Sequence, residues 1–598
     1  MTMKVSDYII SFLEERNVKD VFLLAGGGIM HILDSLIQSN KINKYYNLHE
    51  QACGFCADGH ALFTGKTGVC IVTTGPGGTN TVTAVTSSYI DSTPIVYISG
   101  QVKTTTISCI PGVRQTGAQE ADIVSIVKPV TKYAVSIMRE EDIRYHLEKA
   151  FFIAEHGRPG PVWLEVPLDV QGRQVDIQQL QTFDPFKESF EQSKKPIETD
   201  IAEVYHLLNN AKRPVIMAGS GIRLSHAEES FKKLVYTLKI PVVSSVRVRD
   251  LLINENSEFY FGCVGALPNR YANYILQNSD FMLSIGSGLR YYLTAYDDAN
   301  FAPKAKRVIV NVHNAEIEKL NMDGTKKIIS DAKDFIEAML YSERDIQPDI
   351  SNWLNYCNKL KIKYLSKDEF VPESQNYLNP FLLTHYIGEY MGDESVLVIS
   401  PSAFDYAWNI PRIHGKQRSI CHIGLGSMGT ALPEGIGACI ASGKRTVIFE
   451  GDGSLQHNIQ ELALLRQYNL PVKLFIESNQ GYRQIYSMQN SHFKCRYAGC
   501  TAESGISFPD LKLLAQAYGL KYILISSGNS IEKQIMDVFL DNEPSIIEII
   551  IPMDIGGGLP IIKSKMNPDG SMQTPSLEML YPFLPDAEHA ENMKISEG

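Results

Sequence analysis

Apolar runs of strand length alternate with amphipathic stretches of helical spacing along nearly the whole chain. Clear examples of such runs are KRPVIMAGSGIR, KRTVIFEGDGS and PVKLFIESNQGY, each of which ends in a glycine-rich or polar turn. This alternation is typical of parallel sheets that carry helices on both faces. It restricts the fold to the α/β class, and we expect doubly wound parallel sheets.

The chain is too long for a single hydrophobic core, because 598 residues correspond to roughly three to four domains. Polar and proline-containing segments divide it into three α/β blocks of similar length, which suggests a distant architectural triplication. We expect a first domain at 1–182, a linker at 183–200, a central domain at 201–345, a third domain at 370–555 and a C-terminal arm at 556–598 that lies over the body.

Charge and hydropathy exclude several classes of protein. The formal charge of −11 argues against a nucleic-acid partner. There is no apolar run of about 18 residues and no signal peptide at the start, so we expect no membrane span and a cytoplasmic location. The ten cysteines are too sparse for a disulfide scaffold. The Cys53–Cys56 pair lacks a second pair at zinc spacing, and its small-residue context predicts plain helix packing.

The run from KRTVIFEGDGS to PVKLFIESNQGY predicts a strand, a helix and a second strand. Asp452 follows the first of these strands and Asn479 follows the second, so both lie at the carboxyl edge of a parallel sheet, where ligands bind. Their oxygens are suited to Mg²⁺. The backbone N–H groups of Gly451, Gly453 and Ser454 can approach a diphosphate. The alternative is a tight turn followed by an asparagine cap.

The segment GDGSLQHNIQELALLRQYNLPVK together with SNQGY resembles the signature of thiamine-diphosphate enzymes, in particular the acetolactate synthase branch. The resemblance implies that Asp452 and Asn479 bind the metal through their side chains and Gly481 through its carbonyl. It also implies that Tyr482 lies beside the cofactor. Ser478 stands where the family usually has a further asparagine, and this departure leaves the ligand itself in place.

A second stretch, LHEQACGFCADGHALFTGKTGVCIVTTGPGGTN, resembles the same family's glutamate helix and pyrimidine pocket. The resemblance implies that Glu50 hydrogen-bonds the aminopyrimidine ring and acts as general acid and base. It places Pro76 and Asn80 in the pyrimidine pocket. It also implies a homodimer or homotetramer with active sites between chains. An isolated glutamate here would otherwise be a first-turn charge that the helix dipole favours.

The segment Gly424–Gly429 matches G-x-G-x-x-G, and on that pattern alone it is a dinucleotide fingerprint. When the chain is aligned with the thiamine-diphosphate enzymes, however, the resemblance implies that this loop lies under the aminopyrimidine of the cofactor. Gly426 then contacts the cofactor, and Met428 is the apolar wedge that bends it; the alternative for Met428 is core packing. Ser402, in SPSAFDYAW, aligns with a turn that contacts the diphosphate.

The same alignment with the family implies which residues contact the substrate. The backbone of Gly26 and Gly27 is expected to donate to a substrate oxyanion, with a plain glycine loop ahead of a helix as the alternative. Gln119 matches an active-site glutamine. Its aromatic neighbour in the family is replaced by Ala118, which predicts room for an acceptor larger than pyruvate.

The central block holds FAD in acetolactate synthases. Here AGSGIR keeps a glycine turn, but GSGLRYYLTAYDD departs from the family's pattern, so the sequence leaves the presence of FAD open and favours its absence. The tail, with NPDGSM and YPFL, resembles carboligases of surface-polysaccharide and branched-sugar pathways.

These features together predict an enzyme that uses thiamine diphosphate and Mg²⁺ to decarboxylate a 2-keto acid, with pyruvate expected. The resulting enamine is then ligated to a second carbonyl compound. The alternatives are a biosynthetic acetolactate synthase, a simple non-oxidative decarboxylase, a silent binding protein that kept the fold, and a nicotinamide oxidoreductase that would use the Gly424–Gly429 loop.

Overall fold

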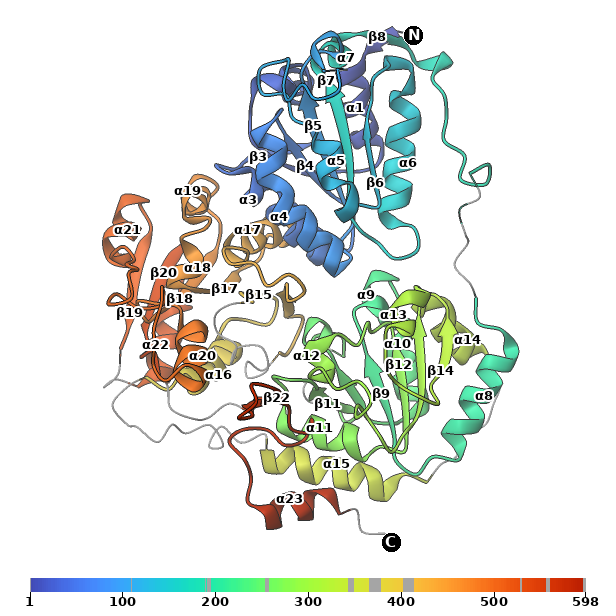
Figure 1. Cartoon of the computed structure of the whole chain (residues 1–598), viewed down its shortest axis with the longest axis vertical. Coiled ribbons are helices and arrows are strands. Elements are labelled where there is room, and N and C mark those ends of the chain that lie inside the picture. Colours follow the sequence, from blue (N-terminus) through green and yellow to red (C-terminus); the bar gives the residue numbers. More distant parts are fainter. Residues whose placement is uncertain are drawn as a thin grey trace.

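The computed structural model describes residues 2–108, 110–188, 190, 195–252, 257–342, 349–364, 378–401, 413–526, 530–554 and 560–594. Ser402 lies outside these residues. The described chain contains three parallel sheets of six strands each, flanked by helices (Figure 1). The predicted α/β class with three doubly wound sheets is therefore confirmed.

The first sheet has the strand order β3-β2-β4-β5-β7-β6, and all its described pairings are parallel. Its inner strands are fully buried and rich in valine and isoleucine, as expected for a sheet covered on both faces. Its strands are β2 (Asp20–Leu23), β3 (Asn43–Tyr46), β4 (Gly68–Val72), β5 (Ile95–Gln101), β6 (Tyr133–Ser136) and β7 (Val162–Pro167). Its helices are α1 (Val5–Glu15), α2 (Met30–Gln38), α3 (Glu50–Thr64), α4 (Pro76–Asp91), α5 (Ile123–Val127), α6 (Ile143–Glu155) and α7 (Leu168–Gly172); a short β1 (Thr2–Lys4) pairs with β8 (Gln174–Asp176).

The central sheet has the order β11-β10-β9-β12-β13-β14. Its strands are β9 (Pro214–Ala218), β10 (Val242–Ser244), β11 (Tyr260–Cys263), β12 (Phe281–Ile285), β13 (Lys306–Asn311) and β14 (Lys326–Ile329). The helices around it are α8 (Glu198–Asn209), α9 (Gly221–Leu224), α10 (Glu228–Leu238), α11 (Arg270–Asn278), α12 (Tyr291–Thr294), α13 (Asn314–Glu318), α14 (Ala332–Tyr341) and α15 (Ser351–Tyr364).

The third sheet has the order β16-β15-β17-β18-β20-β19. Its strands are β15 (Val396–Ile399), β16 (Arg418–Cys421), β17 (Thr446–Gly451), β18 (Val472–Ser478), β19 (Lys521–Ile525) and β20 (Ser545–Ile550). The helices are α16 (Pro380–Tyr390), α17 (Ala431–Ser442), α18 (Asp452–Leu455), α19 (Leu462–Gln467), α20 (Arg483–His492), α21 (Leu511–Ala517) and α22 (Ile531–Val538).

The first and third sheets share one topology, and the central sheet has another. Numbered from the first strand of each main sheet, both outer sheets run second, first, third, fourth, sixth, fifth. The central sheet runs third, second, first, fourth, fifth, sixth, the order of dinucleotide-binding folds. The suggested triplication therefore holds only for the first and third domains at the level of strand order.

The equivalent helices of the two outer domains, α3 and α17, pack closely against each other. A Cβ on Gly59 would lie 2.1 Å from the Glu434 carbonyl oxygen, and one on Gly437 would lie 1.9 Å from that of Cys56. Only glycine permits such an approach of the two backbones. Cys53 and Cys56 are buried free thiols in α3, as the helix-packing prediction expected.

The C-terminal segment lies along the central domain (Figure 1). Asn273 of α11 donates to the Leu577 carbonyl at 2.6 Å, and Tyr364 of α15 donates to the Glu588 carboxylate at 2.6 Å. The segment contains β21 (Lys565–Met566), β22 (Met572–Gln573) and α23 (Asp586–Met593). Among the described residues, none of the helices has the length and apolar character needed to cross a membrane.

Candidate active site

The substrate-side residues of the first domain gather at the carboxyl end of β4. Gly28 donates to Thr73 Oγ1 at 3.1 Å, which brings the turn that contains Gly26 and Gly27 onto the residues that follow this strand. On the other side, a Cβ on Gly75 would lie 2.4 Å from the Gln119 carbonyl oxygen. Gly75 also has φ +64°, so both its backbone conformation and the short distance to Gln119 favour glycine at this position. The glycine turn and the Gln119 loop thus flank the start of α4.

Glu50 is the first residue of α3 and is 8% exposed. Asn80 of α4 donates from Nδ2 to Glu50 Oε2 at 3.0 Å. Pro76 begins α4 and lies one helical turn before Asn80. The structure therefore brings together three residues that the sequence assigned to the pyrimidine pocket.

Asp452 follows β17 directly, because that strand ends at Gly451. Its Oδ1 accepts from Gly453 N at 2.7 Å, while its Oδ2 accepts from Asn479 N at 2.9 Å and Gln480 N at 2.6 Å. Burial raises the pKa of Asp452 to about 6, despite these hydrogen bonds. The turns after β17 and β18 are thus joined through one buried carboxylate.

Close packing around this turn explains its glycines. A Cβ on Gly453 would lie 2.4 Å from Cε1 of Tyr482, and one on Gly481 would lie 2.2 Å from the Cys500 carbonyl oxygen. Asn479 Oδ1 accepts from Gly481 N at 3.1 Å. The predicted metal residues and Tyr482 therefore belong to one tightly packed group.

The Gly424–Gly429 loop lies against the same turn. Gly429, with φ +76°, donates to Ser454 Oγ at 2.9 Å, and its carbonyl accepts from Asn458 Nδ2 at 2.7 Å. Gly426 has φ +68°. A dinucleotide fingerprint follows the first strand of its sheet, whereas this loop follows β16, the edge strand. Gly429 thus lies beside the turn after β17, and the places of Gly426 and Met428 under the aminopyrimidine stay predictions.

The segment around Glu50 and the segment that follows the Asp452 turn also contact each other within the chain. Asn458 Nδ2 also donates to Gln51 Oε1 at 3.1 Å, so the residue next to Glu50 contacts the segment that holds Gly429. Glu461 accepts from Asn47 Nδ2 at 2.9 Å and from Leu48 N at 3.0 Å. Sequence reasoning missed these contacts, although Gln51, Asn458 and Glu461 all lie in the runs that carried the resemblance.

The donor set around Asp452 is suited to Mg²⁺ and a diphosphate. One buried carboxylate, one amide oxygen and one carbonyl are hard oxygen ligands, and Mg²⁺ completes its octahedron with phosphate oxygens and water. Gly451 and Gly453 are buried, and their N–H groups donate to Glu450 Oε1 at 3.2 Å and to Asp452 Oδ1 at 2.7 Å, so their approach to a diphosphate stays a prediction. The residues present therefore fit the cofactor that the resemblance implies.

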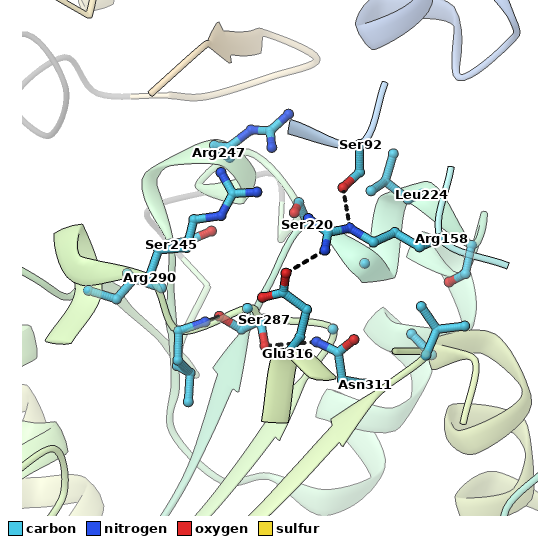
Figure 2. A pocket seen from close by; sticks show the side chains of 18 of the residues that line it. Ser92, Arg158, Ser220, Leu224, Ser245, Arg247, Ser287, Arg290, Asn311 and Glu316 are labelled. Carbon is cyan, nitrogen blue, oxygen red and sulfur yellow. Dashed lines mark hydrogen bonds and ion pairs between the residues drawn. The ribbon is translucent and has the colours of Figure 1, made fainter. Parts of the chain in front are cut away.

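A cavity of about 130 Å³ opens at the carboxyl ends of β9 and β12, where a dinucleotide would bind in a sheet of this order (Figure 2). Arg158, from the first domain, and Glu316 form an ion pair among the residues that line it. The absence of FAD stays a prediction.

Comparison with known proteins agrees with this geometry. Models of the thiamine pyrophosphate enzyme family match in chain order: the N-terminal TPP binding domain at 3–126, the central domain at 201–339 and the C-terminal TPP binding domain at 403–549. The chain is 31% identical over 566 residues to a probable acetolactate synthase large subunit of Methanococcus aeolicus, which covers 92% of each chain. It is 30% identical over 558 residues to the acetolactate synthase large subunit of Lactococcus lactis, covering 91% of this chain and 92% of the relative. The chain therefore belongs to the thiamine pyrophosphate enzyme family, as an acetolactate synthase-like enzyme of thiamine-diphosphate-dependent decarboxylation and carboligation.

Proposed function

We propose that the enzyme decarboxylates pyruvate and joins the remaining two-carbon unit to a second 2-keto acid, which is the reaction of a biosynthetic acetolactate synthase. The relatives' names support this choice of acceptor. The observations that carry the proposal are the Asn80–Glu50 hydrogen bond at the start of α3 and the Asp452 carboxylate that joins the turns after β17 and β18.

Each part of the site has its own role in the proposal. Asp452, Asn479 and the Gly481 carbonyl hold Mg²⁺ and thereby the diphosphate. Thiamine diphosphate, when bound, supplies the electron sink for cleavage of the carbon–carbon bond. Glu50 holds and releases the proton at the pyrimidine ring nitrogen, and Asn80 orients its carboxylate.

The remaining residues act on the substrate. The backbone N–H groups of Gly26 and Gly27 stabilise a developing oxyanion. Gln119 contacts the acceptor, and Tyr482 packs on Gly453 beside the diphosphate. Met428 would pack against the bound cofactor.

A second candidate is ligation onto a larger acceptor, such as a ketosugar. Its support is local: Ala118 is exposed beside Gln119 and fills little of the space that an aromatic side chain would take. Differences of this size in a pocket discriminate between substrates by about 1–3 kcal/mol. Ala118→Phe should then suppress a large acceptor while sparing pyruvate decarboxylation.

A product assay separates these two candidates. Wild type is incubated with pyruvate alone, and then with pyruvate and a series of aldehydes, ketones and nucleotide-linked ketosugars. Acetolactate as the main product in every case, together with no effect of Ala118→Phe, supports the biosynthetic reaction. A ligated large product at the expense of acetolactate contradicts it, and decarboxylation without any ligated product contradicts both candidates.

We also propose a homodimer or homotetramer whose active sites combine Glu50 of one copy with Asp452 of another, as the resemblance implies. The α3–α17 contact joins elements on either side of the whole central domain in sequence. In a dimer, α3 of one copy can therefore pack against α17 of the other copy through the same contact. Two inactive variants, Glu50→Gln and Asp452→Ala, should then recover about a quarter of wild-type activity when mixed by refolding, because random mixing leaves one intact site in every hybrid dimer. No recovery would mean that both residues act within one chain.

A further inference from the structure

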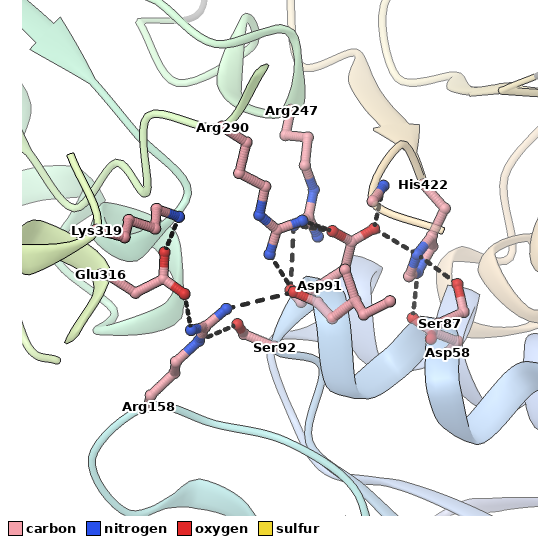
Figure 3. Close-up of polar contacts among 12 residues, drawn as sticks. Asp58, Ser87, Asp91, Ser92, Arg158, Arg247, Arg290, Glu316, Lys319 and His422 are labelled. Atoms are coloured by element: carbon pink, nitrogen blue, oxygen red, sulfur yellow. Dashed lines mark hydrogen bonds and ion pairs between the residues drawn. The ribbon is translucent and has the colours of Figure 1, made fainter. Parts of the chain in front are cut away.

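A buried cluster of ionisable side chains lies where the three domains meet, outside the site described above (Figure 3). His422 is the first residue after β16, and its Nε2 lies 2.9 Å from Asp58 Oδ1 of α3 and 3.2 Å from Glu434 Oε1 of α17. All three residues are at most 1% exposed. One imidazole nitrogen and two carboxylates thus converge from both sides of the α3–α17 contact.

The other ring nitrogen of His422 is held by a carboxylate. His422 Nδ1 lies 2.7 Å from Asp91 Oδ2, at the end of α4, and 3.1 Å from Ser87 Oγ. Asp91 is fixed in turn by two arginines of the central domain: Arg290 Nη1 at 2.7 Å and Arg247 Nη1 at 3.4 Å (Figure 3). A histidine that binds a metal almost always donates its other ring N–H to such a partner. The arrangement orients His422 Nε2 toward Asp58 and Glu434.

Glu434 is the least satisfied member of the cluster. Neither of its carboxylate oxygens has a hydrogen-bond partner among the described residues, and Oε2 has no ion-pair partner there either. Asp58, by contrast, accepts from Ser88 Oγ at 2.6 Å. An unpaired buried carboxylate costs free energy, because water that solvated it in the unfolded chain is not replaced. The side chain is aimed at a position where a cation would compensate it.

We propose that Asp58, His422 and Glu434 bind one divalent first-row transition-metal ion, of which Zn²⁺ is the representative. Their ligand atoms all lie within 4.8 Å of one another. Two metal bonds of about 2.0–2.1 Å at a tetrahedral angle separate the donors by about 3.3 Å. His422 Nε2 lies 2.9 Å from the Asp58 oxygen and 3.2 Å from the Glu434 oxygen. An imidazole ligand favours Zn²⁺ and its neighbours over Mg²⁺, which takes oxygen ligands. The site is therefore chemically distinct from the oxygen-only group at Asp452.

The ion would be structural. It has no route to substrate in this closed position, but it joins α3, which begins with the general acid/base Glu50, to α17, which follows the Met428 loop. Through Asp91 it also reaches Arg290 and Arg247 of the central domain. The metal would thus fix the helix that begins with Glu50 relative to the third domain. Because the ligands must be deprotonated, its binding would release protons.

The test is the metal content of the full-length enzyme, purified with thiamine diphosphate and Mg²⁺ and without chelator from cells supplied with Zn²⁺. Mass spectrometry should find about one zinc ion per chain in wild type. Glu434→Gln, which keeps the shape of the side chain, should lower this at least about tenfold, and Asp91→Asn should weaken zinc retention by about 10–100-fold. Asp452→Ala is the matched control: it should lose Mg²⁺ and keep zinc.

A second measurement covers the case in which Glu434→Gln fails to fold. X-ray absorption at the zinc edge of wild type should show nitrogen as well as oxygen ligands at about 2.0–2.2 Å. Zinc bound by oxygen alone would be zinc at Asp452, and the proposal would be wrong. It would be equally wrong if folded wild type carries no stoichiometric transition metal, even after refolding with Zn²⁺. A protonated His422, paired with the carboxylates around it, would then account for the cluster.

Discussion

Two groups of possible metal ligands occur in this molecule, and they are built in opposite ways. Asp452, Asn479 and Gly481 lie within one strand–helix–strand unit, at the open carboxyl edge of a sheet. Asp58, His422 and Glu434 come from two domains, are held in place by a third, and are closed off from solvent. The first group would bind an ion that holds the cofactor's diphosphate, while the second would bind an ion that only holds the protein together. The group at the edge of the sheet, with oxygen ligands only, is therefore suited to catalysis. The enclosed group, with nitrogen and oxygen ligands, is suited to holding the domains together.

Asp452→Ala should have the largest effect and should separate the two groups completely. Without this carboxylate the diphosphate meets no bridging cation, so thiamine diphosphate and Mg²⁺ should be lost together and activity abolished. Calorimetric titration of both ligands checks this. Unchanged cofactor affinity would show that the turn after β17 is only structural.

Gly437→Ala should have the next largest effect, and on the other group. The added Cβ would lie 1.9 Å from the Cys56 carbonyl oxygen, so α3 and α17 must separate, at a cost of about 3 kcal/mol in the free energy of unfolding. The shift should also move His422 away from its carboxylate partners and displace Glu50. Denaturant unfolding and zinc content measure the two consequences. Full stability with normal zinc content would argue against the close α3–α17 contact.

The smallest expected effect is a pH dependence at Glu461, which joins the two halves. Burial raises its pKa to about 7. The folded protein therefore holds a proton that the unfolded chain releases above about pH 4.5, so stability should fall as the pH rises from about 5 to about 7 and level off above that. The contribution is on the order of 1–3 kcal/mol.

Glu461→Gln should remove this slope, because glutamine does not titrate. It should also lower the free energy of unfolding by about 1 kcal/mol, because the amide nitrogen would face one of the two donors, Asn47 and Leu48, and one hydrogen bond would be lost. Unfolding free energies of both proteins between pH 5 and 8 provide the check. An identical slope in the variant would assign the pH dependence to another group.

The contrast between the two groups also explains what the sequence could predict. Asp452 and Asn479 follow neighbouring strands, and strand ends that share a sheet edge are neighbours in space, so local pattern was sufficient. Glu50, Pro76 and Asn80 required the family resemblance, because nothing local brings the start of α3 to α4. The strand alternation predicted three sheets but not that the central one has a different order.

The buried cluster could not be predicted from sequence. Asp58 looks like an ordinary polar position in a small-residue helix, and His422 follows an edge strand. Asp58 and His422 are 364 positions apart in the sequence, and the α3–α17 contact brings them together. Arginines of the central domain hold Asp91, which in turn orients His422. Periodicity and capping describe neighbours along the chain, so they carry no information about such a contact.

The central claim is that Glu50 activates a cofactor held at the Asp452 turn. Its most direct test is deuterium exchange at the thiazolium C2 of bound thiamine diphosphate, followed by NMR after acid quench, in wild type and Glu50→Gln. We predict that the variant binds the cofactor with near wild-type affinity, because the diphosphate end is untouched, and that its exchange is slower by about 10²–10⁴-fold. Exchange at the wild-type rate in Glu50→Gln would contradict the account.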